Sequence, residues 1–472
     1  MNPSVFREYD IRGVVGTDIV EADVERLGRT WGTYLARRGV HEVLVGYDTR
    51  ASSPAFRDAL VEGLTAVGRR VIDIGTVVTP IFYWARVHYG IDGGVMITAS
   101  HNPAEFNGFK LALGPATIYG EEIQDVRRLM ERESGTVGSD ADARSGDGPF
   151  ETGQVEHRNP VPDYIAMLAE KIKLGPRPLK VVVDAGNGTA ALFAEDVMRA
   201  YGVKSVVPLF CAPDPTFPNH HPDPVVAKNL ADLIREVKTT GADVGIAFDG
   251  DGDRIGVVDD AGQILWGDQL MILYWREILV RHPGARAIIE VKCSKTLVDE
   301  VVRLGGEPEF FKTGHSLIKA RMREVGSVFT GEMSGHMFFA DEYYGFDDAL
   351  YAAGRLLRIL SHSDVPLSDL LADVPRLPST PEVRVSCPDE EKFDVVAALR
   401  DQFRARYPVI DVDGMRVNYP FGWGLVRASN TQPALVIRAE ADTEEHLRQI
   451  TGDLEEALAR FPVVGSVNWE GE

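Results

Sequence analysis

The chain has 472 residues, enough for roughly three or four domains. Hydrophobic residues make up 44% and charged residues 26%, a composition typical of a soluble globular protein. With 71 acidic residues against 50 Lys and Arg, the formal net charge is −21, which argues against nucleic acids and anionic membranes as partners. An anionic substrate would need a locally basic pocket.

Cysteine usage and the N-terminus bear on the compartment. The three cysteines, Cys211, Cys293 and Cys387, show no paired spacing, so neither a disulfide framework nor a thiolate zinc site is expected. The N-terminus lacks an apolar signal region, and no uncharged apolar run is long enough to span a bilayer. We therefore expect a cytoplasmic protein.

Three stretches of the chain share one plan of strand, helix, strand, helix and strand. The first runs from 42 to the loop at Ser100, the second from 180 to 249 and the third from 287 to 332. The first helix is clearly indicated, because Ser53-Pro54 begins it and apolar residues follow at helical spacing. Such alternation predicts α/β domains with largely parallel sheets, whose terminal loops lie at the carboxyl ends of the strands, where ligands collect.

The last part of the chain follows a different pattern. Residues 134–153 are rich in Gly, Ser and Asp and predict an exposed loop, and 373–381 carry three prolines and read as a linker. Beyond the linker we expect a smaller α+β domain whose final helix begins at Asp442 or Thr443. The predicted domains are 1–152, 153–258, 259–372 and 373–472.

A candidate nucleophile follows the apolar run 93–97. Ser100 stands at the end of this predicted buried strand, on a turn enforced by Asn102-Pro103, which is a position suited to chemistry. A capping serine in a plain strand-to-helix connection would look similar. The hexapeptide alone leaves these two interpretations nearly even.

The most specific motif is the run 249–254. Asp249, Asp251 and Asp253 alternate with glycines that allow tight turns, so their oxygens can converge on one hard cation such as Mg²⁺. Open coordination positions would suit phosphate chemistry, and Arg254 offers a planar fork for phosphate. A solvated acidic turn is the weaker interpretation. An EF-hand is a poor match, because Arg254 stands where that loop needs glycine.

Two further loops carry polar side chains at the ends of predicted strands. Glu332, Ser334 and His336 could point the same way and bind sugar hydroxyls, although this loop alone would favour a tight turn with an incidental histidine. The other loop offers a phosphate cradle, with an ordinary polar hairpin turn as the alternative. Its candidate residues are Arg427, Ser429, Asn430 and Thr431.

Several isolated residues are weaker candidates, because a lone Lys or His is more often a surface or packing residue. They are Lys110, Lys292, His315, Tyr9 and Arg12. The proline-rich run 217–224 contains adjacent His220 and His221, which diverge on any regular element. A rigid loop is therefore expected there in place of a metal site.

Taken together, these motifs resemble the α-D-phosphohexomutase superfamily. The resemblance runs from Tyr9 to Thr431, and four loops occur in the family's order. They are the serine loop (98–103), the metal loop (249–254), the sugar loop (331–336) and the phosphate loop (427–431). The sugar loop, with Met333, is similar to that of the phosphomannomutase/phosphoglucomutase group, since phosphoglucosamine mutases typically carry Gln at that position. The resemblance implies four domains around a central cleft, the first three α/β with similar mixed or parallel sheets.

The resemblance also implies a mechanism. Ser100 would be a phosphoserine, and Mg²⁺ would be held by Asp249, Asp251, Asp253 and an oxygen on Ser100. The enzyme would interconvert hexose 1-phosphate and hexose 6-phosphate, of mannose or glucose, through a hexose 1,6-bisphosphate that also serves as activator. Because a serine alkoxide is a poor leaving group, the transfer depends on positioning and charge neutralisation.

The resemblance assigns roles to the remaining candidates. Glu332, Ser334 and His336 would read sugar hydroxyls, and Lys110 and His315 are the best general acid/base candidates. Residues expected near phosphate in the cleft are Arg254, Lys292, Tyr9 and Arg12. The phosphate that is not transferred would be held by Arg427, Ser429, Asn430 and Thr431.

Three alternatives stay open at this point. One is a phosphoglucosamine mutase, and another is a haloacid-dehalogenase-like phosphatase, in which Asp249 would be the nucleophile and Ser100 would be unexplained. The third is a catalytically idle sugar-phosphate binder. The sequence leaves the preferred epimer and the choice between monomer and dimer open. Because the last domain follows the proline-rich linker, we also expect it to close on bound ligand.

Overall fold

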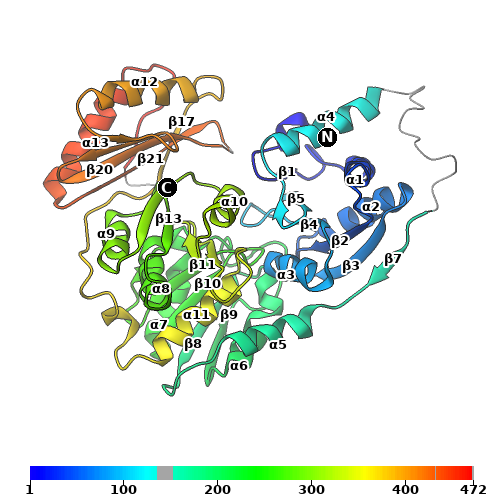
Figure 1. Cartoon of the computed structure of the whole chain (residues 1–472), viewed down its shortest axis with the longest axis horizontal. Coiled ribbons are helices and arrows are strands. Elements are labelled where there is room, and N and C mark those ends of the chain that lie inside the picture. The colour runs from blue at the N-terminus through cyan, green and yellow to red at the C-terminus, as the bar shows by residue number, and fades with distance from the viewer. Residues whose placement is uncertain (136–151, 431, 470–472) are drawn as a thin grey trace. The chain divides into compact units, whose positions relative to one another are not determined.

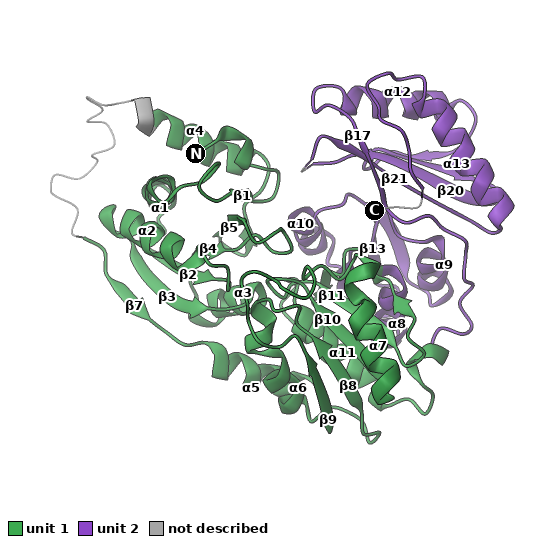
Figure 2. Cartoon of the chain, turned by 180° about the vertical axis from the view of Figure 1, so that it is seen from behind, with its two compact units in different colours: residues 1–267, 334–369 green, residues 268–333, 370–472 purple. Residues whose placement is uncertain are grey.

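The structure is a computed structural model that describes residues 1–135, 152–430 and 432–469. It divides into two compact units, unit 1 with residues 1–267 and 334–369 and unit 2 with residues 268–333 and 370–472 (Figure 2). Most of the predicted loop 134–153, and Thr431 of the predicted phosphate loop, lie outside the described residues. Among the described helices, none is long and apolar enough to cross a bilayer.

The first sheet of unit 1 is mixed and has the order β1-β5-β4-β2-β3-β7, with β6 paired to β5 (Figure 1). Strands β4, β2, β3 and β7 are parallel, whereas β5 runs antiparallel to β4, β1 and β6. The strands are β1 (Ile11–Val14), β2 (Glu42–Tyr47), β3 (Arg70–Thr76), β4 (Gly93–Ile97), β5 (Phe106–Leu113), β6 (Ala116–Thr117) and β7 (Val155–His157). The helices are η1 (Pro3–Val5), α1 (Glu21–Ala36), α2 (Ser53–Ala66), α3 (Thr79–Tyr89) and α4 (Glu121–Gly135).

The second sheet of unit 1 has the order β12-β11-β10-β8-β9. Strands β10, β8 and β9 are parallel, and β11 and β12 continue the sheet antiparallel. The strands are β8 (Lys180–Asp184), β9 (Ser205–Leu209), β10 (Val244–Phe248), β11 (Ile255–Asp259) and β12 (Ile264–Leu265), and β16 (Met337–Phe339) also belongs to unit 1. The helices are α5 (Val161–Lys171), η3 (Thr189–Leu192), α6 (Ala194–Tyr201), η4 (Ala227–Leu230), α7 (Ala231–Thr240), α11 (Ala349–Ser361) and η5 (Leu367–Asp369).

Unit 2 contains the parallel strands β14-β13-β15 and an antiparallel sheet of order β17-β21-β20-β19-β18. Its strands are β13 (Arg286–Glu290), β14 (Glu307–Phe311), β15 (Phe329–Gly331), β17 (Val383–Ser386), β18 (Val409–Ile410), β19 (Met415–Tyr419), β20 (Gly422–Ala428) and β21 (Ala434–Ala441). Its helices are α8 (Gly267–Arg281), which enters the unit at Asp268, α9 (Lys295–Arg303), α10 (His315–Val325), α12 (Lys392–Arg404) and α13 (Glu444–Leu458).

The three predicted repeats have the same strand order. In each, the first strand is central, the second pairs on one side and the third on the other, all parallel: β4-β2-β3, β10-β8-β9 and β15-β13-β14. The loops after β4, β10 and β15 are those that carry the predicted functional residues. The predicted fold class, three related α/β sheets followed by a smaller α+β domain, is confirmed, while the exact domain boundaries stay a prediction.

The last domain packs firmly on the segment after β13. Trp423 and Leu425 form an apolar cluster with Val291. The guanidinium of Arg416 lies 3.7 Å from the centre of the Trp423 ring and donates to the carbonyl oxygens of Val291 and Cys293. Closure of the last domain alone, which stays a prediction, would therefore have to break buried contacts within unit 2.

Substitution of Asp348 should destabilise unit 1. This fully buried carboxylate caps α11 through the N–H of Tyr351 at 2.8 Å and accepts hydrogen bonds from Tyr164 at 2.7 Å and Tyr343 at 2.6 Å. Asp348→Ala removes the cap and the carboxylate that both buried hydroxyls use as acceptor, at a cost of about 3 kcal/mol in the free energy of unfolding. Urea denaturation should show a lower midpoint, whereas the exposed Asp364→Ala should change the free energy by less than about 0.5 kcal/mol. Equal midpoints would contradict this account of α11.

Candidate active site

Ser100 lies where the chain leaves β4, in a backbone conformation that few non-glycine residues adopt. Its φ is +52°, in the left-handed region, and the turn is closed by a hydrogen bond from the Ser100 N–H to Thr98 Oγ1 at 2.9 Å. The Ser100 hydroxyl is buried and donates to Asp249 Oδ2 at 2.7 Å. The structure therefore brings the predicted nucleophile and the predicted metal loop together, although 149 residues separate them.

The three predicted metal ligands follow β10 and are fully buried. One carboxylate oxygen from each of Asp249, Asp251 and Asp253 lies within 4.8 Å of the others, so the group could hold a metal ion. Asp249 Oδ1 accepts the N–H groups of Asp253 and Arg254 at 3.1 Å each, which closes the loop around it. Oδ1 of Asp251 and Oδ1 of Asp253 are buried without a hydrogen-bond partner among the described residues, and a bound cation would satisfy both.

Lys110, on β5, faces this acidic group. Its ammonium donates to Asp251 Oδ2 at 2.9 Å and to Asp253 Oδ2 at 2.5 Å, and Thr79 donates to the same oxygen of Asp251 at 2.6 Å. Burial raises the pKa of Asp249 well above its ordinary value, and the neighbouring carboxylates raise it further. Burial alone would lower the pKa of Lys110, but Asp251 and Asp253 outweigh it and raise that pKa, so the amine stays protonated. Its proton-transfer role stays a prediction.

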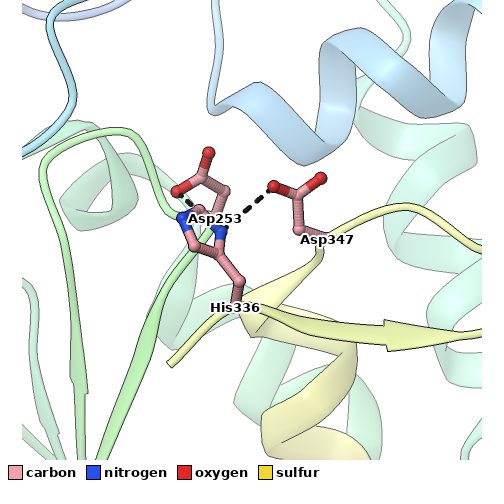
Figure 3. A group of neighbouring side chains, drawn as sticks. All are labelled: Asp253, His336 and Asp347. Atoms are coloured by element: carbon pink, nitrogen blue, oxygen red, sulfur yellow. Dashed lines mark ion pairs between the residues drawn. The ribbon is translucent and has the colours of Figure 1, made fainter. Parts of the chain in front are cut away.

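His336 lies against the same loop. Arg254 Nε donates to His336 Nε2 at 3.0 Å, so that nitrogen is the acceptor and Nδ1 carries the proton. Nδ1 faces Asp347 Oδ2 at 3.1 Å and Asp253 Oδ1 at 3.6 Å, and Figure 3 shows the imidazole between the two carboxylates. The sequence analysis missed Asp347. Its position in the pair Asp347-Asp348, immediately before α11, was the one feature of the sequence that could have indicated it.

Strand β1 supplies a cation, Arg12, to the loop that carries Ser100. Arg12 donates to the side-chain oxygen of Asn102 at 2.5 Å and pairs with Asp10 at 2.5 Å. Tyr9 precedes this pair and is partly buried. His101, also missed, lies 3.1 Å from Ser100 Oγ through Nδ1. Burial and the positive charges of Arg254 and Arg12 hold its pKa well below the usual value, so the ring is neutral.

The predicted sugar loop crosses the division between the units, because Glu332 and Met333 belong to unit 2 and Ser334 and His336 to unit 1. In unit 2, Glu332 Oε1 accepts the N–H of Gly314 at 2.7 Å, immediately before His315 begins α10. The structure thus places Glu332 beside the start of α10. How these residues act together stays a prediction.

Lys292 lies between two carboxylates of unit 2. Its ammonium is 3.2 Å from Glu290 and 2.8 Å from Glu382. Glu290, which the sequence analysis missed, is fully buried and also accepts from Thr313 Oγ1 at 2.6 Å and from the N–H of Met333 at 2.9 Å. This carboxylate therefore ties Lys292 to the start of the sugar loop.

The predicted phosphate loop is the hairpin between β20 and β21. Arg427 pairs with Asp413 at 2.9 Å. Lys392, a buried residue of α12 that the sequence analysis missed, donates to the carbonyl oxygens of Ser429 at 2.6 Å and Gln432 at 3.0 Å. Asn430 lies in the same turn. The Lys392 ammonium thus holds the backbone on both sides of this turn, and the binding of phosphate by the turn stays a prediction.

The proline-rich run 217–224 is a structural support. His220 Nε2 lies 3.1 Å from Asp184, whereas His221 is exposed, so the two imidazoles diverge as expected. A Cβ at Gly186 would lie 2.9 Å from Pro222 Cβ, and a Cβ at Gly250 would lie 3.5 Å from Pro222 Cγ. This run therefore packs behind the metal loop.

Comparison with protein-family profiles gives four matches in chain order. Residues 3–136, 162–262 and 266–377 match the phosphoglucomutase/phosphomannomutase alpha/beta/alpha domains I, II and III, respectively. Residues 382–457 match the phosphoglucomutase/phosphomannomutase C-terminal domain.

Whole-chain relatives agree with these matches. The chain is 44% identical over 448 residues to a phosphomannomutase/phosphoglucomutase of Pseudomonas aeruginosa, covering 95% of this chain and 94% of the relative. It is 40% identical over 462 residues to a phosphoglucomutase of Neisseria meningitidis, covering 97% of each. A crystal structure of a phosphoglucomutase/phosphomannomutase family protein from Burkholderia thailandensis superposes with a TM-score of 0.88 at 41% identity, over 99% of this chain and 100% of that one.

Proposed function

The chain belongs to the phosphoglucomutase/phosphomannomutase family and is a phosphohexomutase, an isomerase, and we propose that it acts on glucose and mannose phosphates through a phosphoserine at Ser100. The observation that carries this proposal is the 2.7 Å hydrogen bond from the Ser100 hydroxyl to Asp249 within a group of three buried carboxylates. A nucleophile in direct contact with such a group is the arrangement that phosphoryl transfer requires.

We propose that the carboxylates hold Mg²⁺, with Asp249, Asp251, Asp253 and an oxygen on Ser100 as ligands. The two buried Oδ1 atoms without hydrogen-bond partners among the described residues fit a small cation that prefers oxygen. When bound, Mg²⁺ neutralises the charge that develops on the transferring phosphoryl group and on the serine oxygen.

The chemistry divides into two transfers. First, the bond between phosphorus and Ser100 Oγ breaks, and a bond forms from phosphorus to the free hydroxyl oxygen of a hexose phosphate, which loses its proton to a base. The product is a hexose 1,6-bisphosphate, which reorients and returns its other phosphoryl group to Ser100. Lys110 and His315 are the proposed proton-transfer residues; Lys110 starts as a protonated donor beside Asp251 and Asp253.

We propose that residues of both units bind the hexose phosphate. Glu332, Ser334 and His336 are proposed to read the sugar hydroxyls. The residues proposed to hold the phosphate that is not transferred are Arg427, Ser429, Asn430 and Thr431. Those proposed to line the path of phosphate are Arg254, Lys292, Tyr9 and Arg12. Met333 contacts the guanidinium of Arg438 on β21. We propose that Met333 disfavours glucosamine phosphate, which a comparison of turnover on three sugar phosphates tests.

Turnover should be highest on the glucose and mannose esters. We expect the purified chain, with Mg²⁺ and a trace of hexose 1,6-bisphosphate, to convert glucose 1-phosphate and mannose 1-phosphate to their 6-phosphates. Glucosamine 1-phosphate should react more slowly, and chelation of Mg²⁺ should stop all three reactions. The measurement is the appearance of each hexose 6-phosphate.

Each alternative predicts a different result in this panel. A preference for glucosamine 1-phosphate would make the enzyme a phosphoglucosamine mutase and show that Met333 does not set specificity. Release of free phosphate would support the phosphatase hypothesis, and no reaction with any ester would support a sugar-phosphate binder.

A further inference from the structure

Arg50, just beyond β2, holds the serine loop from beneath. The residue is 2% exposed, and its two terminal nitrogens donate to four backbone carbonyl oxygens of one short segment. Nη2 donates to Ser100 at 2.7 Å and Asn102 at 2.6 Å, and Nη1 to Pro103 at 2.6 Å and Phe106 at 2.9 Å. Four carbonyl groups between Ser100 and Phe106 therefore converge on one guanidinium.

Asp48 also holds Arg50 in place. Arg50 Nε lies 3.2 Å from Asp48 Oδ2, and the other oxygen of Asp48 accepts the Arg50 N–H at 3.0 Å and the Ser53 hydroxyl at 2.5 Å. The ring of Phe217, in the proline-rich run, lies 5.4 Å from the guanidinium carbon. A planar, rigid fork with five donors can reach these acceptors at once, whereas a lysine ammonium on its flexible stem cannot.

The turn that Arg50 holds is strained. A non-glycine residue at φ +52°, as Ser100 is, is sterically unfavourable and persists only where the surroundings fix it. Within the turn, the Asn102 N–H donates to Ala99 O, and from outside it the Val15 N–H donates to Glu105 O and Arg12 donates to Asn102 Oδ1. Arg50 connects this turn to the end of β2, so the position of Ser100 Oγ depends on it.

We propose that Arg50 is a positioning residue for phosphoryl transfer, which sets the distance of Ser100 Oγ from the metal loop without touching the sugar. The inference rests on the proposed function and deepens it. Loss of the hydrogen bonds from Arg50 to the serine loop should lower the rate of phosphoryl transfer to and from Ser100. The affinity for the sugar phosphate should stay nearly unchanged.

The test compares two buried arginines of unit 1, neither of which lies on a strand. Arg86, on α3, is 6% exposed and donates to the carbonyl oxygens of Asp92 and Gly114, next to the start of β4 and away from Ser100. Arg50→Lys should lower kcat by at least about tenfold with KM within about twofold of wild type, since misplaced reacting groups cost rate. Arg86→Lys should keep kcat within about threefold.

A second measurement keeps the inference testable if Arg50→Lys is less stable. Hydrogen exchange of the amides of 98–106, measured under conditions where both variants are folded, should be faster in Arg50→Lys than in Arg86→Lys. Equal kcat values and equal rates of amide hydrogen exchange for the two variants would overturn the proposal that Arg50 positions Ser100. If wild type and Arg86→Lys both lack mutase activity, the proposed function fails instead, so the two failures are distinguishable.

Discussion

Ser100→Ala should reduce mutase turnover to background, a loss of about 10⁴-fold or more, as removal of a nucleophile typically gives. The variant lacks the oxygen that accepts and returns the phosphoryl group, and the hydroxyl that donates to Asp249 at 2.7 Å. The measurement is conversion of glucose 1-phosphate to glucose 6-phosphate in the presence of Mg²⁺. With ³²P-labelled hexose 1,6-bisphosphate, label should appear on the wild-type peptide that contains Ser100 and be absent from the variant.

The matched control for this variant is a serine of the same unit outside the site. Ser205, on β9, is partly buried and lies at the edge of the second sheet, so Ser205→Ala should keep full turnover. Label that persists in Ser100→Ala, on an acid-labile aspartyl peptide, would contradict the prediction. It would move the nucleophile to Asp249 and revive the phosphatase hypothesis.

Much of the fold could be predicted because its signals are local. The helix α2 begins at Ser53 and buries Phe56, Leu60 and Leu64 at helical spacing, and β10 is an apolar run that ends where the aspartates begin. Repetition of this local pattern three times predicts the shared strand order. Since parallel strands end at a common edge of a sheet, it also predicts that the terminal loops carry the site.

The residues that hold the loops could not be predicted in this way. Arg50, Asp347 and Lys392 act through partners distant in sequence, and for Arg50 and Lys392 most of these partners are backbone carbonyl groups, which every residue has. A lysine or arginine in a sequence is most often a surface residue. Only the fold shows that these two cations are buried and that each one binds the backbone of a loop with predicted functional residues.

The sugar loop shows where spacing alone is insufficient. Alternate residues face the same side only in extended backbone. Gly335 has φ +90°, and a Cβ there would lie 2.4 Å from the carbonyl oxygen of Ile255, so the chain turns between Ser334 and His336. His336 accordingly reaches Arg254 and Asp347, contacts that the pattern of alternating polar residues did not indicate.

Gly250→Ala should give the second large effect, a loss of about 100-fold in kcat, because misplacement of reacting groups by about 1 Å costs that much. A Cβ at this position would lie 2.3 Å from the Ser100 carbonyl oxygen and 3.1 Å from its carbon. The backbone of Gly250 is outside the left-handed region, so alanine fits its conformation and the whole effect falls on the serine loop. The measurements are kcat for conversion of glucose 1-phosphate and the rate of Ser100 phosphorylation by hexose 1,6-bisphosphate.

Gly452→Ala is the control for this substitution, because a Cβ on Gly452 of α13 meets nothing within 4 Å and kcat should stay at the wild-type value. Equal activity of the two alanine variants would mean that the serine loop can move away from the metal loop without loss. The carbonyl oxygen of Ser100 also accepts a hydrogen bond from Arg50 at 2.7 Å, so Arg50→Lys and Gly250→Ala act on the same carbonyl group. Their effects should therefore be coupled, and Arg50→Lys combined with Gly250→Ala should lose less activity than the product of the two single losses.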